Sequence, residues 1–183
     1  MVNKKEGLDK IKDGETYSDV ITLNLDTYQD LFSDFDAREY RQKSVSDDFL
    51  IECKRACKDK GEKIELKLFV PKIKRNLSNE TNIKKRLKEH FQRHLKEQEK
   101  SINKIKKAGL LWFFAGAVIL TLNGIIFQRE EALLKFLSTI LEPASWFFFW
   151  EGLGKMFIES RKGIPDYEFN KKMSHATIRF LDR

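Results

Sequence analysis

The sequence predicts a membrane protein: an α-helical hairpin of two transmembrane helices with a small cytosolic α+β domain, in which a long helix is continuous with the first transmembrane helix. Two apolar runs predict the spans, and the first of them holds 20 residues without a charge. Stretches of alternating polar and apolar residues, placed before and after these runs, predict strands. The charge is also segregated. Residues 72–107 hold 13 Lys and Arg against 4 Asp and Glu, so the basic character lies just before the first span.

The cytosolic α+β domain is expected at residues 1–79, and its leader, 1–17, is polar. The leader has no apolar signal-peptide core, so nothing directs the N-terminal region across a membrane. Strands are expected at 19–25 and 62–70, with a helix over 46–60 between them and a basic linker after the second strand. Cys53 and Cys57 share one face of that helix, and we expect a buried thiol pair.

A long helix is expected to begin near Glu80 and to meet no breaker before the end of the first apolar run. It comprises a basic cytosolic part at 80–107 and the first span at 108–127. A 20-residue helix covers about 30 Å, which is the thickness of one hydrocarbon core. The whole helix is expected to be about 70 Å long.

The second apolar run, 133–158, is expected to be the second span, although Pro143 interrupts it. A helix lying on the membrane surface is the alternative. It is disfavoured because residues 159–183 are expected to return to the cytosol, where a last strand at 176–181 pairs with the strand at 62–70. Lysines and arginines flank both runs on the side away from the short connecting loop, so the positive-inside rule places both termini in the cytosol.

A stripe of residues at alternating steps of four and three follows the long helix. Its members are apolar in the cytosolic half and include small residues in the membrane half, as helix contacts in lipid require. A 3.5-residue period held this long indicates packed helices. Because so short a chain shows no partner for the whole stripe, we expect a homo-oligomeric bundle, with a tetramer as first guess. The alternative is that the cytosolic stripe packs on its own domain and the membrane match is coincidental. The predicted oligomer seam is Phe91, Leu95, Ile102, Ile105, Gly109 and Gly116.

Polar residues within or beside the apolar runs are candidates for a pore. A charge at the centre of a membrane helix costs about 2.5 to 3.5 kcal/mol, so such residues usually face a bundle interior or water. Two interpretations stay open. In one, the carboxylates line a cation pathway; in the other, they mark the two interfaces of the membrane. The candidates are Asn123, Glu142, Glu151 and Lys155.

Basic residues crowd the start of the long helix. Lys84 precedes the first span by about 35 Å of helix, which is too far for contact with lipid if the helix stands upright. Two interpretations remain: a solvated helix face, or a site for a phosphate-rich ligand such as a nucleotide or short single-stranded oligonucleotide. The candidate ligand-binding residues are Lys84, Lys85, Arg86, His90, Arg93 and His94.

The sequence predicts no enzyme, cofactor or metal centre. It contains no glycine-rich phosphate loop, nucleophile elbow or catalytic Cys/His pair. His90 and His94 have a spacing that suits zinc, but no third ligand is evident at a fixed distance.

A family resemblance covers most of the chain from about Val20. It is carried by the segments LFSDFDAREYRQKSVSDDFLIECKRA, EKIELKLFVP, EHF at 89–91 and TIRFL, and by two spans, the second with Trp146 and Trp150. These resemble small bacterial two-span membrane proteins with a split cytosolic α+β domain. The chain is also similar to the membrane effector subunits of Hailong-type antiphage operons. There, a partner nucleotidyltransferase makes an oligonucleotide signal, and the membrane protein opens as an ion channel.

We therefore expect a multi-pass protein of the bacterial inner membrane, whose partners are the lipid bilayer, further copies of itself and a nucleotide or oligonucleotide. The expected function is that of a ligand-gated homo-oligomeric ion channel that depolarises the membrane in antiphage defence. The alternative is a non-conducting membrane anchor or adaptor for a cytosolic partner.

Overall fold

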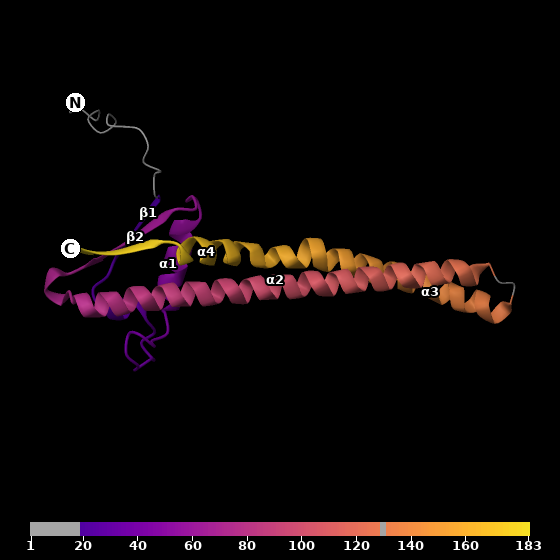
Figure 1. The fold of residues 1–183 in the computed structure, drawn as a ribbon, viewed down its shortest axis with the longest axis horizontal. Helices are drawn as coiled ribbons and strands as arrows, with labels where there is room; N and C mark the ends of the chain where they lie inside the picture. Colours follow the sequence, from indigo (N-terminus) through magenta and orange to yellow (C-terminus); the bar gives the residue numbers. More distant parts are fainter. Residues whose placement is uncertain (1–18, 129–130) are drawn as a thin grey trace, which may run out of the picture.

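A computed structural model describes residues 19–128 and 131–183. The molecule is mostly helical and elongated, with a small sheet at one end and the tip of a long helical hairpin at the other (Figure 1). The leader expected at 1–17 lies outside the described residues, as do residues 129 and 130 of the loop between the two apolar runs.

The sheet has three parallel strands in the order β1 (Asp19–Asn24), β2 (Ile64–Val70) and β3 (Thr177–Asp182). All three strands were predicted, and the expected pairing of the last one with β2 is confirmed. Every second residue of β2 is buried, because a strand turns alternate side chains to opposite faces. The sheet therefore joins a strand that precedes the hairpin to one that follows it.

The connection from β1 to β2 contains a 3₁₀ turn, η1 (Tyr28–Leu31), and the helix α1 (Asp47–Cys57). Helix α1 turns Phe49, Cys53 and Cys57 into the core of the domain, so the predicted thiol pair is buried. Burial raises the pKa of the Cys53 thiol to about 12, and this thiol is therefore unreactive at neutral pH.

Helix α2 (Leu77–Phe127) follows a short 3₁₀ turn, η2 (Lys72–Lys74). It begins three residues earlier than predicted because Asn76 caps it. The side-chain oxygen of Asn76 accepts hydrogen bonds from the backbone N–H groups of Ser78 (3.0 Å) and Asn79 (3.2 Å). As predicted, no break interrupts the helix before the end of the apolar run.

The return is helical throughout. It consists of α3 (Ala132–Gly154), the π turn η3 (Lys155–Glu159), the 3₁₀ turn η4 (Ser160–Gly163) and α4 (Ile164–Ser174), which together run beside α2 (Figure 1). The prediction that Pro143 interrupts the second run is wrong, since α3 passes through it. A proline in a helix removes one backbone hydrogen bond, and the neighbouring turns hold the helix together here.

The hairpin contains two helices that are long and apolar enough to cross a membrane. Only 11% of the residues in the most apolar part of each are buried. The core helix of a soluble protein would be mostly buried, so the apolar surface of this hairpin needs an apolar environment from outside the single chain.

Candidate functional site

Small residues form the interface between α2 and α3. On α2 they lie seven residues apart, and the facing stripe on α3 has the same spacing. A seven-residue spacing keeps one face of each helix turned toward its neighbour. The residues are Gly109, Gly116 and Asn123 on α2, and Ser138, Ser145 and Gly152 on α3, and all six are buried.

The two backbones touch at this interface. A Cβ atom added to Gly152 would lie 2.5 Å from the backbone nitrogen of Phe113 and 2.7 Å from the carbonyl oxygen of Gly109. One added to Gly116 would lie 2.6 Å from the backbone nitrogen of Phe149. Glycine is therefore required at these positions, as in membrane helix pairs that meet through small residues.

The prediction of an oligomer seam is corrected along this stripe, because it faces the same chain. Gly109 and Gly116 are occupied by α3 and the start of η3. Phe91 is fully buried in the core of the domain, where its ring contacts Phe169 of α4 at 5.8 Å between centroids. Ile102 lies beside Gly163 of η4, and the remaining members, Leu95 and Ile105, are half-buried. The predicted absence of an intramolecular partner was wrong because residues 159–174 continue the return helix.

The second stripe was missed in the sequence, although its signal is present there. After Gly152 the next small buried residue is Ser160, eight positions on instead of seven. The π turn η3 takes up this extra residue, since a π turn holds one residue more than an α-helical turn. The Ser160 hydroxyl donates a hydrogen bond of 2.6 Å to the carbonyl oxygen of Met156 and so remains satisfied in the contact.

The register of α3 on α2 places Glu142 near the middle of the apolar part of the hairpin, measured along the helix axis. Gly109 faces Gly152, and Gly116 faces the turn from Ser145 to Phe149. Glu142 therefore lies level with residues just beyond Gly116, about 17 Å of helix from one end of the uncharged run and about 12 Å from the other. The interpretation that Glu142 marks an outer interface is thus disfavoured.

The Glu142 side chain is exposed on the flank of the hairpin. Its backbone carbonyl accepts a hydrogen bond from the Ser145 hydroxyl, but among the described residues nothing bonds its carboxylate. Hydroxyls on the same helices behave differently: Thr121 and Thr139 each donate to a carbonyl of the preceding turn, at 2.8 and 3.0 Å. Glu142 is thus a carboxylate presented outward from the middle of an apolar surface.

Asn123 lies at the end of the stripe nearest the hairpin tip and is 7% exposed. Its side-chain oxygen is buried and accepts no hydrogen bond from the described residues. Burying an amide oxygen without a hydrogen-bond partner costs free energy, so Asn123 is an unfavourable contact in this interface.

Glu151 and Lys155 lie at the end of the interface nearest the sheet domain, close to the level of Gly109. The Lys155 ammonium is 2.9 Å from a carboxylate oxygen of Glu151 and 3.3 Å from one of Glu159. This cluster lies beside the lysines at the end of the basic segment of α2. Its position favours the interface interpretation for both residues, whereas Glu142 and Asn123 remain the candidates within the apolar run.

The predicted ligand-binding residues on α2 do not form one free surface. Lys84 lies 5.6 Å from the centre of the Phe180 ring, and Arg86 donates a hydrogen bond of 2.7 Å to the carbonyl oxygen of Lys43. His90 is buried, and this burial lowers its pKa to about 4. These three side chains hold the domain together.

Of the other three predicted ligand-binding residues, Lys85 and Arg93 are exposed and His94 is half-buried, and each lies beside a carboxylate of its own helix. Lys85 is 4.0 Å from Glu89, and both Arg93 and His94 reach Glu97, at 4.0 and 3.2 Å. Such exposed pairs are weak. Within the described ranges, no group of three or more His, Cys, Asp or Glu residues is placed to hold a metal ion.

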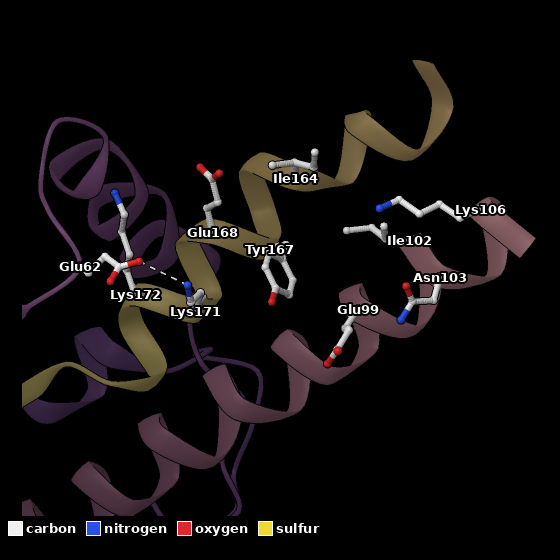
Figure 2. A pocket seen from close by; sticks show the side chains of 10 residues that line it. All are labelled: Glu62, Glu99, Ile102, Asn103, Lys106, Ile164, Tyr167, Glu168, Lys171 and Lys172. Carbon is white, nitrogen blue, oxygen red and sulfur yellow. Dashed lines mark hydrogen bonds and ion pairs between the residues drawn. The ribbon is translucent and has the colours of Figure 1, made fainter. Parts of the chain in front are cut away.

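A cavity of about 570 Å³ lies between α2 and α4, where the sheet domain meets the hairpin (Figure 2). The Tyr167 ring projects between the two helices, and the wall carries three carboxylates and three amines. Lys171 is paired with Glu62 at 3.3 Å. Because the charges balance, the cavity has no preference for an anion. The charged residues are Glu62, Glu99, Glu168, Lys106, Lys171 and Lys172.

Comparisons of the chain with family models, with curated proteins and with solved structures found no match in any of the three.

Proposed function

We propose that the hairpin crosses a bacterial inner membrane twice, with the sheet domain in the cytosol, and that several copies form a cation channel opened by a ligand of that domain. The observation that carries the proposal is the exposed carboxylate of Glu142 at the middle of the apolar hairpin. The two-span topology is supported by the length and apolar surface of both helices.

A carboxylate at this depth is costly in lipid, and it is rare unless it faces a protein interior or water. The single chain does not cover it. Copies packed around the flank that carries Glu142 would remove it from lipid and place a ring of carboxylates along a shared axis. Rings of this kind select cations in many channels.

The pore is proposed to lie between copies and not within one hairpin. The α2–α3 interface is filled by backbone contact at Gly109, Gly116 and Gly152, so no path for an ion runs through it. The outward faces of both helices, rich in aromatic residues, remain available for neighbouring copies and for lipid. Exposed members include Phe114, Val118, Trp146, Phe147 and Trp150.

A nucleotide or short oligonucleotide is the signal we propose, in the setting of antiphage defence. The net positive charge of residues 72–107 and the resemblance described above support this choice. A non-conducting anchor has the same topology, but it gives no reason for an exposed carboxylate at mid-depth. Glu142 therefore separates the two functions.

Ion flux from reconstituted liposomes tests the proposal. With short single-stranded oligonucleotides present, we expect cation flux from the unchanged protein and a loss of about tenfold or more in Glu142→Gln. Glutamine costs less than a carboxylate in lipid, so insertion is retained. The matched control is Glu89→Gln on the cytosolic part of α2, which is expected to conduct normally.

Equal flux from Glu142→Gln and the unchanged protein would remove Glu142 from the pathway. Flux without any ligand would retain the channel and reject the proposed signal. An absence of flux from protein shown to be inserted would establish the anchor instead.

A further inference from the structure

We propose that a second cavity, between α1 and α4, binds a small organic anion with a flat apolar body. The cavity measures about 390 Å³, which is within the range of small-molecule sites. Its regulatory role rests on the proposed function, because the ligand bound here would be the one that opens the channel. The binding itself is a property of the cytosolic domain.

The floor of the cavity is apolar. It is formed by Ile51 and Cys57 of α1 and by Pro165 and Phe169 of α4. Ile51 is 47% exposed, so this part of the floor is open to water. A flat apolar group placed against Phe169 and Pro165 would remove this surface from water.

The rim of the cavity is strongly basic. It holds Lys54, Arg55, Lys58 and Lys172 against a single carboxylate, Glu168; Lys172 and Glu168 also line the cavity between α2 and α4. This composition differs from the balanced charge of the cavity between α2 and α4, and it complements an anion.

Two of these cations are not neutralised by the protein. Lys54 is paired with Asp166, and Arg55 lies 2.8 Å from Glu52. In contrast, Lys172 donates to the carbonyl oxygen of Lys60 at 2.6 Å, and Lys58 has no ion pair among the described residues. Lys58 and Lys172 therefore add positive charge to the rim that no ion pair among the described residues offsets, and this charge complements a phosphate or carboxylate.

The position of the cavity excludes a lipid headgroup as the occupant. Phe169 lies 14 residues beyond Lys155 along the return helix, about 20 Å of helix past the end of the apolar hairpin. A soluble ligand of the cytosol is therefore the occupant we propose.

The cavity is connected to the hairpin through rigid elements. Its α4 wall continues through η4 and η3 into α3, and Phe169 also contacts Phe91 of α2. An occupant that draws α1 toward α4 would bias the angle at which the return helix leaves the domain. A ligand shifts such an equilibrium by the difference between its affinities for the two states.

Calorimetric titration of the full chain in lipid nanodiscs tests the site, with 1-naphthyl phosphate as the probe. Inorganic phosphate and adenosine monophosphate are titrated in parallel, and empty nanodiscs correct for partition into lipid. We expect the naphthyl probe to bind, and Lys58→Glu to weaken it by about tenfold or more. The matched control, Lys85→Glu, makes the same charge change on an exposed face of α2 and is expected to bind normally.

A second variant distinguishes loss of the site from misfolding caused by the charge reversal in Lys58→Glu. Ile51→Ser leaves the charge unchanged and is expected to weaken the naphthyl probe by roughly fivefold, because it removes apolar floor. Equal weakening by Lys58→Glu and Lys85→Glu would overturn the site, and so would inorganic phosphate binding as tightly as the naphthyl probe. Tight binding of adenosine monophosphate would identify nucleotides as the physiological class.

The titration tests the cavity and the flux experiment tests the channel, so either proposal can be rejected while the other stands. Binding that depends on Lys58 in a protein without flux would uphold this cavity and reject the channel. Ligand-dependent flux that is unchanged in Lys58→Glu and Ile51→Ser would uphold the channel and reject the cavity.

Discussion

Protonation of the buried residue His90 is coupled to the stability of the fold. Burial lowers its pKa from the usual 6.5 to about 4, and the neighbouring His94, Arg86 and Arg93 act in the same direction. The unfolded chain takes up a proton at His90 below about pH 6.5, whereas the folded chain does so only near pH 4. The unfolded state thus binds more protons in this window, and stability must fall as the pH falls.

We therefore expect the melting temperature, followed by circular dichroism in detergent, to decrease between pH 7 and pH 4.5 by more than in His90→Asn. Asparagine at this position cannot titrate, so it removes the contribution of His90. The exposed His175 provides the control, and His175→Asn should retain the full decrease. An unchanged pH dependence in His90→Asn would show that other groups dominate.

Single residues also show the limit of sequence reasoning about the site. The charge and polarity of Glu142, Glu151 and Lys155 were visible, but their depths were not. Depth is set by the register of α3 on α2, and backbone contact at Gly109, Gly116 and Gly152 fixes that register. Likewise, the sequence shows the basic residues of α2 as a block. It does not show that Lys84 contacts Phe180 or that Arg86 bonds to Lys43, because these partners are distant in sequence.

The elements were predictable where their patterns are local. Alternation within β2 and the uncharged run in α2 each define an element without reference to the rest of the chain. For residues 159–174 we expected only a return toward the last strand, and we predicted no helix there. Pro165 lies in the first turn of α4, where backbone N–H groups have no partner within the helix. Proline therefore removes no hydrogen bond there, and the return helix continues.

The hairpin itself can be tested at Gly116. Gly116→Leu would force a side chain into the backbone of α3, and we expect a loss of about 1 to 3 kcal/mol in stability toward denaturation by dodecyl sulfate. Gly124 lies on the same helix with nothing within 4 Å of an added Cβ, so Gly124→Leu is the matched control and should be nearly neutral.

Equal losses in the two variants would contradict the small-residue interface. Because Gly116 packs within one chain, this substitution tests the hairpin and does not distinguish a channel from an anchor. That distinction remains with Glu142.

At the scale of the whole molecule, β2 is covered by β1 on one edge and by β3 on the other. β3 also contributes Phe180 to the core and Asp182 to an ion pair with Arg75, 2.6 Å long, at the start of α2. This closure was predicted from the alternation at both ends of the chain. The parallel orientation of all three strands was not predicted, because alternation carries no information about direction.

Removal of residues 177–183 should therefore open the sheet domain and leave the apolar hairpin intact. The loss of Phe180 alone is expected to cost about 3 kcal/mol or more, and the β2 edge becomes unpaired. Limited trypsin digestion of nanodisc samples should cleave α1 and the following loop much faster in the truncated chain. Removal of Arg183 alone, whose exposed ion pair with Asp26 is weak, is the control. Equal resistance of the two truncated chains would show that β3 is dispensable.

The placement of β2 between strands from both sides of the hairpin also sets an order of events during synthesis. The ribosome delivers β1, α1 and β2 first, then both apolar helices, and β3 only afterwards. One edge of β2 therefore stays unpaired until both apolar helices have been made. If both helices cross a membrane as proposed, a chain that inserts only one of them leaves β3 in the opposite compartment, away from β2. In the proposed topology, closure of the sheet therefore depends on the insertion of both helices.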